Sequence, residues 1–125
     1  HILYKSCTEH PLYRWEKIVH TVRRIISSGL IPFLEQQFNY PKVIVLFGSC
    51  ARGENIERSD IDLFIIAEAK KEDIQLQQFE EILGSEVQLF VHTQQETTAL
   101  ITTNNDLLNS VVNGIVLSGY FEVFV

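Results

Sequence analysis

Residues 43–67, VIVLFGSCARGENIERSDIDLFIIA, contain two predicted strands and the connection between them, and this stretch decides the expected fold. Val43–Phe47 is a short, continuous apolar run rich in β-branched residues, which predicts a strand buried on both faces. From Ile61 to Ala67, successive side chains alternate between the two faces of a second predicted strand. The connection begins with a glycine-serine turn and ends with two aspartates that stand one residue apart.

The turn after the first strand has the composition of an anion-binding site. Gly48 lets a ligand approach the backbone closely, and the hydroxyl of Ser49 can donate to a phosphate oxygen. Arg52 is a candidate partner for the same anion, and the first N–H groups of a short helix over residues 51–54 would point the same way. No Gly-Lys-Ser/Thr and no GxGxxG pattern follows, so the sequence excludes a Walker loop and a dinucleotide fingerprint.

Asp60 and Asp62 are candidate metal ligands and catalytic residues. They stand two apart at the start of the second strand, so both carboxylates project from one face. Two uncompensated carboxylates repel each other and are costly on an otherwise apolar sheet, whereas a bound Mg²⁺ would remove this conflict. The alternative is that Asp60 caps a turn and Asp62 pairs with Arg52 or Arg58. The preceding glycine-serine turn favours the metal site.

Helical and strand patterns alternate along the rest of the chain. Apolar residues recur at helical spacing from Leu12 to Ile26, and Pro32 is expected to open a second short helix. The other expected elements are a helix at Lys71–Leu83 with Ile74 and Ile82 on its packed side and Gly84 at its end, a strand at Val87–Val91, short helices at Glu96–Ile101 and Asp106–Val112, and β segments at Ile115–Leu117 and Tyr120–Val125. This alternation predicts an α/β or mixed α+β fold.

The length and the net charge of the chain exclude several classes of protein. The 125 residues suit one domain with its own core. Ten Lys and Arg against sixteen Asp and Glu give a net charge of −6, so direct binding to nucleic acid or to an anionic membrane is not expected. The sequence contains no apolar run near the roughly 20 residues of a membrane span and no secretory signal, so we expect a cytoplasmic protein.

The cysteines and histidines show no metal-ligand spacing. Cys7 and Cys50 lie far apart, which predicts two free structural thiols in a reducing compartment. The four histidines form no HExxH pattern, so no zinc site is predicted. The chain starts at His1 and contains no methionine, which we interpret as a fragment of a longer protein or a cloning remnant.

The segment around the aspartates resembles a known family. Residues 46–53, LFGSCARG, together with residues 59–63, SDIDL, are similar to the signature of the polymerase-β-type nucleotidyltransferases, and within them to the minimal nucleotidyltransferase (MNT) proteins. The resemblance is specific over residues 43–67 and extends by the order of elements to Val91. It implies a small mixed sheet flanked by helices.

The same resemblance implies a reaction and its residues. Gly48 and Ser49 map to nucleotide binding, and Asp60 and Asp62 map to metal binding. The implied reaction transfers a nucleoside monophosphate from ATP or another nucleoside triphosphate to a hydroxyl, with Mg²⁺ or Mn²⁺ as the cofactor.

Gln88 departs from the pattern of that family. The family places a third carboxylate on the next strand, and here the segment reads Val87-Gln88-Leu89. A neutral amide is a weaker ligand than a carboxylate, so its presence should weaken chemistry more than triphosphate binding. Glu86 lies one pleat repeat away, roughly 7 Å, and substitutes only if the strand is bulged or shifted.

The family resemblance and the departure at Gln88 together leave two functions open. The first is an active nucleotidyltransferase, and in toxin–antitoxin pairs of the MNT type the resemblance suggests a hydroxyl of a partner toxin as the acceptor. The second is a catalytically impaired nucleotide-binding module that serves as an antitoxin or as part of a transcription regulator.

We expect residues 1–39 to form an N-terminal helical region and residues 40–125 a nucleotidyltransferase-like domain, as one globular unit. Residues 8–15 are similar to the join in archaeal proteins that fuse a winged-helix DNA-binding module to such a domain, which implies a DNA-reading part upstream. An ordinary helix packed on the sheet, with Trp15 in the core or at its edge, explains the same residues and is favoured. We interpret Tyr120, Phe121 and Phe124 as core or as a homodimer contact.

Overall fold

The computed structural model describes residues 10–69 and 73–122, which contain a four-stranded sheet in the order β3-β2-β1-β4. The strands are β1 (Val43–Phe47), β2 (Ile61–Ile66), β3 (Val87–His92) and β4 (Ile115–Gly119). β1 pairs antiparallel with β2 and β4, and β2 pairs parallel with β3. The sheet is therefore mixed, and the predicted fold class is confirmed.

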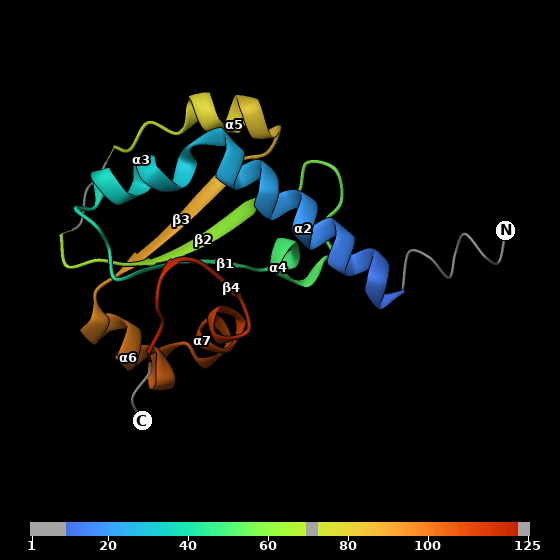
Figure 1. Cartoon of the computed structure of the whole chain (residues 1–125). Coiled ribbons are helices and arrows are strands. Elements are labelled where there is room, and N and C mark those ends of the chain that lie inside the picture. Colours follow the sequence, from blue (N-terminus) through green and yellow to red (C-terminus); the bar gives the residue numbers. More distant parts are fainter. Residues whose placement is uncertain (1–9, 70–72, 123–125) are drawn as a thin grey trace, which may run out of the picture.

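Helices cover both faces of this sheet (Figure 1). One face carries α2 (Pro11–Ser28), α3 (Leu30–Gln37) and α5 (Gln77–Leu83), and the other carries α6 (Gln94–Thr103) and α7 (Asn105–Val112). The short helix α4 (Ser49–Arg52) directly follows β1 and contacts α2. None of the helices in the described ranges has the length and hydrophobicity that a membrane crossing requires.

β1 is an interior strand, and all five of its residues are buried, as its apolar run predicts. Ile44 and Leu46 belong to the core cluster beneath α2, α3 and α5. The other three side chains of β1 belong to a second cluster with Phe64 and Ile66 of β2 and Leu108 and Val111 of α7. The continuous run thus reflects a strand with a hydrophobic core on each side.

α2 is two residues longer at its C-terminal end than the apolar periodicity predicts, and it begins at Pro11. The backbone N–H of Leu12 donates to Nδ1 of His10, which caps the helix at 3.1 Å. Gly29 ends α2 in the left-handed region at φ 83°, and α3 starts at the next residue. Pro32 therefore lies inside the first turn of α3 and does not open that helix, which corrects the prediction.

α5 is much shorter than the predicted helix at Lys71–Leu83. It begins at Gln77, and residues 70–72 lie outside the described ranges. Asp73 adopts φ 61°, a left-handed conformation through which a right-handed helix cannot continue. Ile74 still packs against the core from the preceding loop, but Ile82 is exposed, contrary to the prediction.

The end of the described chain differs from the sequence prediction. β4 ends at Gly119, and residues 120–122 lie outside the sheet, so the predicted β segment at Tyr120–Val125 is wrong for this part. Residues 123–125, including Phe124, are not among the described ones. Tyr120 is exposed, whereas Phe121 packs against the cluster beneath α6 and α7.

Gly53 and Gly84 have almost the same backbone conformation in different surroundings. Gly53 ends α4 at φ 68°, ψ 24°, and Gly84 ends α5 at φ 68°, ψ 21°. A Cβ at Gly53 would lie 2.4 Å from the carbonyl oxygen of Arg14 in α2, whereas a Cβ at Gly84 would meet nothing within 4 Å. The backbones of α2 and α4 are therefore in direct contact at Gly53.

Replacing each of the two glycines with alanine separates the effect of the contact with α2 from the cost of the left-handed backbone conformation. We expect Gly84→Ala to lower the free energy of unfolding by about 1 kcal/mol, because only the backbone conformation is strained. Gly53→Ala should lower it by roughly 1–3 kcal/mol more, since α2 must also move. Urea denaturation followed by circular dichroism measures both values, and equal losses would contradict the close packing of α2 on α4.

Candidate functional site

The glycine-serine turn lies against the second aspartate. Gly48 adopts φ 78°, ψ −155°, and a Cβ at this position would lie 2.7 Å from Oδ2 of Asp62. Phe47, the last residue of β1, is the cross-strand partner of Asp62. A residue with a side chain at position 48 would therefore be strained and would also collide with the carboxylate. Ser49 begins α4 at this point.

Asp60 and Asp62 interact electrostatically, and the second carboxylate is partly withdrawn from water. Oδ1 of Asp62 is buried and has no hydrogen-bond partner in the described part of the chain. Desolvation by burial, followed by the charge of Asp60, raises the pKa of Asp62 above its ordinary value. The free protein thus holds a carboxylate whose charged form lacks compensation.

Gln88 of β3 lies beside the two carboxylates of Asp60 and Asp62. It is the register partner of Asp62 across the parallel β2–β3 pair, and its Nε2 donates to Oδ2 of Asp60 at 2.8 Å. The pairing from Ile61–Val87 to Ile66–His92 runs without a bulge. Glu86 therefore does not shift into the position of Gln88, and the condition for its substitution is not met.

His92 lies at the other end of β3. Its ring stacks on Phe64 with the centroids 4.9 Å apart. His92 is therefore four residues along the strand from Gln88 and is not part of the carboxylate site.

Arg52 has an acidic partner of its own, close in sequence. Its Nε donates to Oε1 of Glu54 at 2.7 Å, and both side chains are exposed. That interaction lowers the pKa of Glu54, mainly through the hydrogen bond and then through the charge of Arg52. Among the described residues, no Lys or Arg forms an ion pair with Asp60 or Asp62, so the alternative pairing of Asp62 with arginine is not seen.

Cys50 is a buried free thiol behind the site, as predicted, while Cys7 lies outside the described residues. Its Sγ lies 3.6 Å from the carbonyl oxygen of Asp60 and donates to it. Burial, and then the charge of Asp62, raises the pKa of Cys50. The protonated thiol thus helps to hold the loop that carries Asp60.

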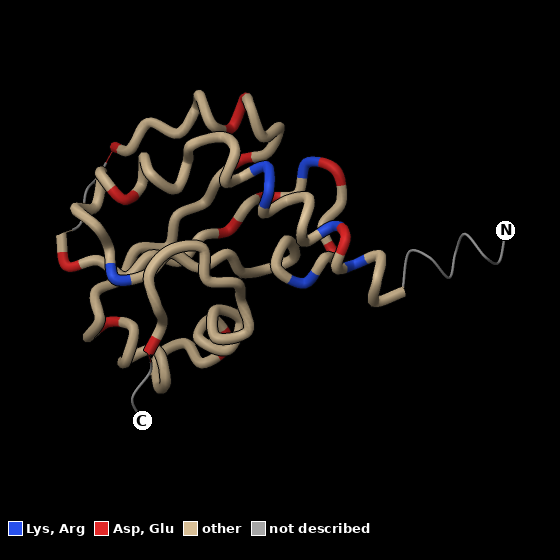
Figure 2. Tube along the Cα trace, in the orientation of Figure 1, with Lys and Arg blue, Asp and Glu red and all other residues tan. Residues whose placement is uncertain are grey.

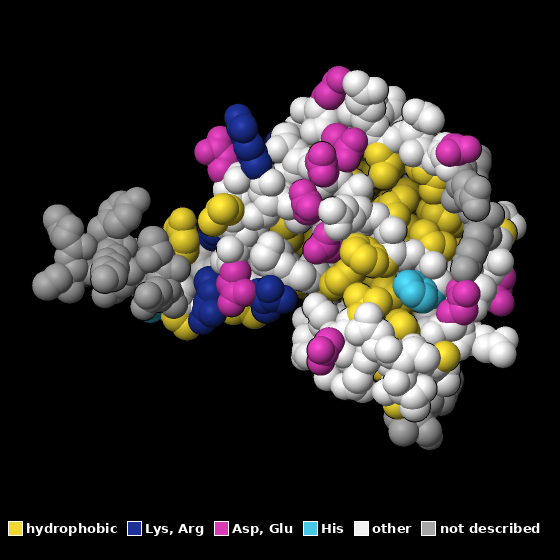
Figure 3. Space-filling model, turned by 180° about the vertical axis from the view of Figure 1, so that it is seen from behind, with side chains coloured by type: hydrophobic (Ala, Val, Ile, Leu, Met, Phe, Trp, Pro, Cys, Tyr) yellow, Lys and Arg dark blue, Asp and Glu magenta, His cyan; other side chains and the backbone are white. Residues whose placement is uncertain are grey.

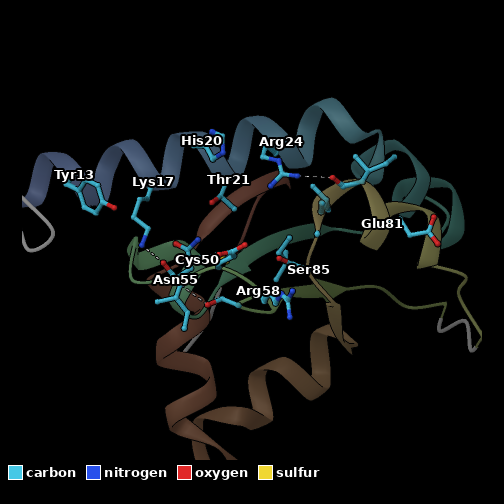
Figure 4. Close-up of a pocket in the computed structure, with 17 residues that line it drawn as sticks. Tyr13, Lys17, His20, Thr21, Arg24, Cys50, Asn55, Arg58, Glu81 and Ser85 are labelled. Atoms are coloured by element: carbon cyan, nitrogen blue, oxygen red, sulfur yellow. Dashed lines mark hydrogen bonds between the residues drawn. The ribbon is translucent and has the colours of Figure 1, made fainter.

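A cavity of about 780 Å³ opens between α2, the loop that precedes β2, and the turn between α5 and β3 (Figure 4). Lys17, His20 and Arg24 line it from α2, and Arg58 faces them from the loop (Figure 4). Figure 2 shows the same concentration of basic residues along α2 and around the loop. Ile61 also lines this cavity, so it adjoins the opposite face of β2 from Asp62.

Two of these cations bind backbone carbonyls across the cavity. Lys17 Nζ donates to the carbonyl oxygen of Asn55, and Arg24 donates to that of Ile82 at 2.8 Å. They attach the loop and α5 to α2. The sequence does not reveal this role, because the partners are separated by 38 and 58 residues.

The donor set at the carboxylates fits a divalent cation that is shared with a ligand. Asp60 and Asp62 offer hard oxygen ligands, and Oδ1 of Asp62 has no hydrogen-bond partner among the described residues. The described residues contain no cluster of three or more His, Cys, Asp and Glu with metal-binding geometry. Two carboxylates suit Mg²⁺ when phosphate oxygens and water supply the remaining ligands.

Comparison with known proteins identifies one match. A family model described as a nucleotidyltransferase domain matches residues 27–111, which is well over half of the chain. The matched range includes the glycine-serine turn, both aspartates and Gln88. Neither the curated proteins nor the solved structures contain a match to this chain.

Replacing Asp62 tests the uncompensated carboxylate. Because its folded-state pKa is raised, Asp62 contributes most to stability below its ordinary pKa near 4, and this contribution is lost as the pH rises through the folded value. We therefore expect Asp62→Asn to raise the melting temperature of the metal-free protein at pH 7 by about 3 °C, and by less at pH 4.5.

Differential scanning fluorimetry with and without Mg²⁺ measures this effect. Mg²⁺ should raise the melting temperature of the original protein and leave that of Asp62→Asn unchanged. A variant that melts lower than the original at pH 7 would show that the carboxylate is stabilised by its surroundings and not strained by them.

Proposed function

Because the chain belongs to the family of polymerase-β-type nucleotidyltransferase domains, we propose that Gly48, Ser49, Asp60 and Asp62 form its site for a nucleoside triphosphate and Mg²⁺. Membership supports a general function in transfer of a nucleoside monophosphate. The finer assignment is that the triphosphate lies on the glycine-serine turn and that the carboxylates hold the cation.

One observation carries this assignment: Asp62 is a partly buried carboxylate, without a hydrogen bond to Oδ1, placed against a glycine that leaves no room for a side chain. Such an arrangement raises the energy of the free protein. Sites that store an electrostatic cost of this kind are typically ligand sites, because the ligand removes the cost.

The chain's own residues have binding and orienting roles in this reaction. The turn at Gly48 and Ser49 would hold the phosphates by backbone N–H groups and a hydroxyl. When bound, Mg²⁺ would neutralise charge on the triphosphate and on the departing pyrophosphate. The acceptor oxygen would bond to the α-phosphorus as the bond to the β-phosphate oxygen breaks, and the hydroxyl proton would leave for solvent or a carboxylate.

Gln88 supports a second candidate function, a module that binds the nucleotide without efficient turnover. Its amide N–H occupies Oδ2 of Asp60, so a cation at this oxygen competes with the hydrogen bond. An amide also cannot accept the proton of an attacking hydroxyl, as a carboxylate can. Regulation of a partner protein, such as a toxin in an antitoxin role, would then depend on binding.

Binding is the first test of the proposed function. We expect the protein to bind ATP in the presence of Mg²⁺, and Asp60→Asn together with Asp62→Asn to weaken this binding at least tenfold, or about 1.4 kcal/mol. Isothermal titration calorimetry with and without Mg²⁺ measures both effects. Glu57→Gln is the matched control, because it removes an exposed carboxylate of the same loop that forms no ion pair among the described residues, and it should leave binding unchanged. Equal affinity with and without the aspartates would refute the site.

Gln88 decides between the enzyme and the binding module. We expect Gln88→Asp to raise the rate of label transfer from α-labelled ATP to hydroxyl acceptors by about tenfold or more, since a third carboxylate adds a cation ligand and a proton acceptor. Gln88→Asn has the same length without the charge, and it should not raise the rate. If both variants behave alike, the missing carboxylate is not what limits transfer.

A further inference from the structure

An apolar stripe runs along the exposed side of α2. Its residues Leu12, Trp15, Val19, Val22 and Ile26 follow one another at intervals of three, four, three and four. Leu12, Trp15, Val19 and Ile26 are 61%, 62%, 49% and 58% exposed, so Trp15 is not a core residue. The helix is held to the domain mainly by other residues, among them the buried Ile18 and Ile25, while Val22, at the edge of the stripe, is half-buried against the same core.

The intervals of this stripe match the seam of a two-helix coiled coil. Alternating steps of three and four keep one line of side chains on the face that meets a second helix, over about four turns of α2. A single exposed apolar residue needs no explanation, but a continuous line at this period is typical of a helix contact.

A groove beside the stripe gives room for side chains of a second helix. It has a volume of about 620 Å³ and lies between α2 and the start of β4, with Val19, Val22 and Ile26 on one wall and Gly114 and Ile115 on the other. The N-terminal half of α2 also extends beyond the edge of the sheet (Figure 1). In Figure 3, which shows the molecule from behind, apolar and charged side chains lie side by side on this projecting part.

One negative and one positive side chain lie next to the stripe, and their arrangement indicates which kind of helix could pair with it. Glu16 directly follows Trp15, and Arg23 directly follows Val22, so both flank the seam on the same side. Both are exposed, and neither side chain forms a hydrogen bond or ion pair with another residue of the described ranges. They stand seven residues apart with opposite charge.

We propose that this face of α2 pairs with α2 of a second copy of the chain in antiparallel orientation. In antiparallel coiled coils, positions on the same flank of the two helices face each other. A twofold axis near His20 therefore brings Glu16 next to Arg23 of the second copy, and Arg23 next to Glu16. The same register sets Trp15 against Ile26 of the second copy and Val19 against its Val22. A parallel pair would bring neither charge to an opposite partner.

Sedimentation velocity of the 125-residue chain over a range of concentrations tests the pairing. We expect a concentration-dependent dimer, and Val19→Asp should raise its dissociation constant by about a hundredfold, because an unpaired carboxylate enters the seam. Ile82→Asp is the matched control, since Ile82 is 58% exposed, against 49% for Val19, and lies on α5 outside the stripe. It should leave the dimer unchanged, and circular dichroism verifies that both variants are folded.

Charge exchange tests the orientation. Glu16→Arg and Arg23→Glu should each weaken the dimer by about tenfold, because each creates two like-charge contacts. An equal mixture of the two single variants should form a heterodimer, and the double exchange should recover the original affinity. A chain that stays monomeric at all concentrations, or a dimer insensitive to Val19→Asp, overturns the proposal. Failure of both the mixture and the double exchange to restore affinity overturns the antiparallel orientation.

Discussion

The close approach between the backbone of Gly48 and the carboxylate of Asp62 is the constraint on which the site depends. β1 and β2 pair through Phe47 and Asp62, so the chain that leaves β1 must turn directly over the aspartate. Only a residue without a Cβ satisfies both this proximity and the conformation at φ 78°. The turn, the start of α4 and the partial burial of Asp62 are therefore parts of one arrangement.

The central strands were predictable because local composition determines them. Val43–Phe47 is apolar at every position, and the sheet buries every one of these side chains. Positions 61–66 alternate between two clusters, and this places Asp62 on the same face as Phe64. The mixed sheet, which the family resemblance implied, is confirmed by the antiparallel and parallel pairs on either side of β2.

The misjudged features depend on contacts that a pattern does not contain. The apolar spacing before Gln77 resembles a helix, but Asp73 turns the chain into the left-handed region, and Ile74 packs from a loop. The sequence also does not indicate that Arg52 contacts Glu54 in the free protein, because this contact depends on side-chain direction and not on sequence spacing. The hydrogen bond from Gln88 to Asp60 likewise needs the register of β3 against β2.

The contact between α2 and α4 places unequal demands on its two partners. A Cβ at Gly53 would first meet the carbonyl oxygen and the Cβ of Arg14, atoms that almost every amino acid possesses. Position 14 can therefore exchange its side chain freely while the interface keeps its shape. Position 53 has no such freedom. The outer surface of α2 can thus acquire new charges and new binding properties through substitution, without disturbing the support that this helix gives to the turn at Gly48 and Ser49.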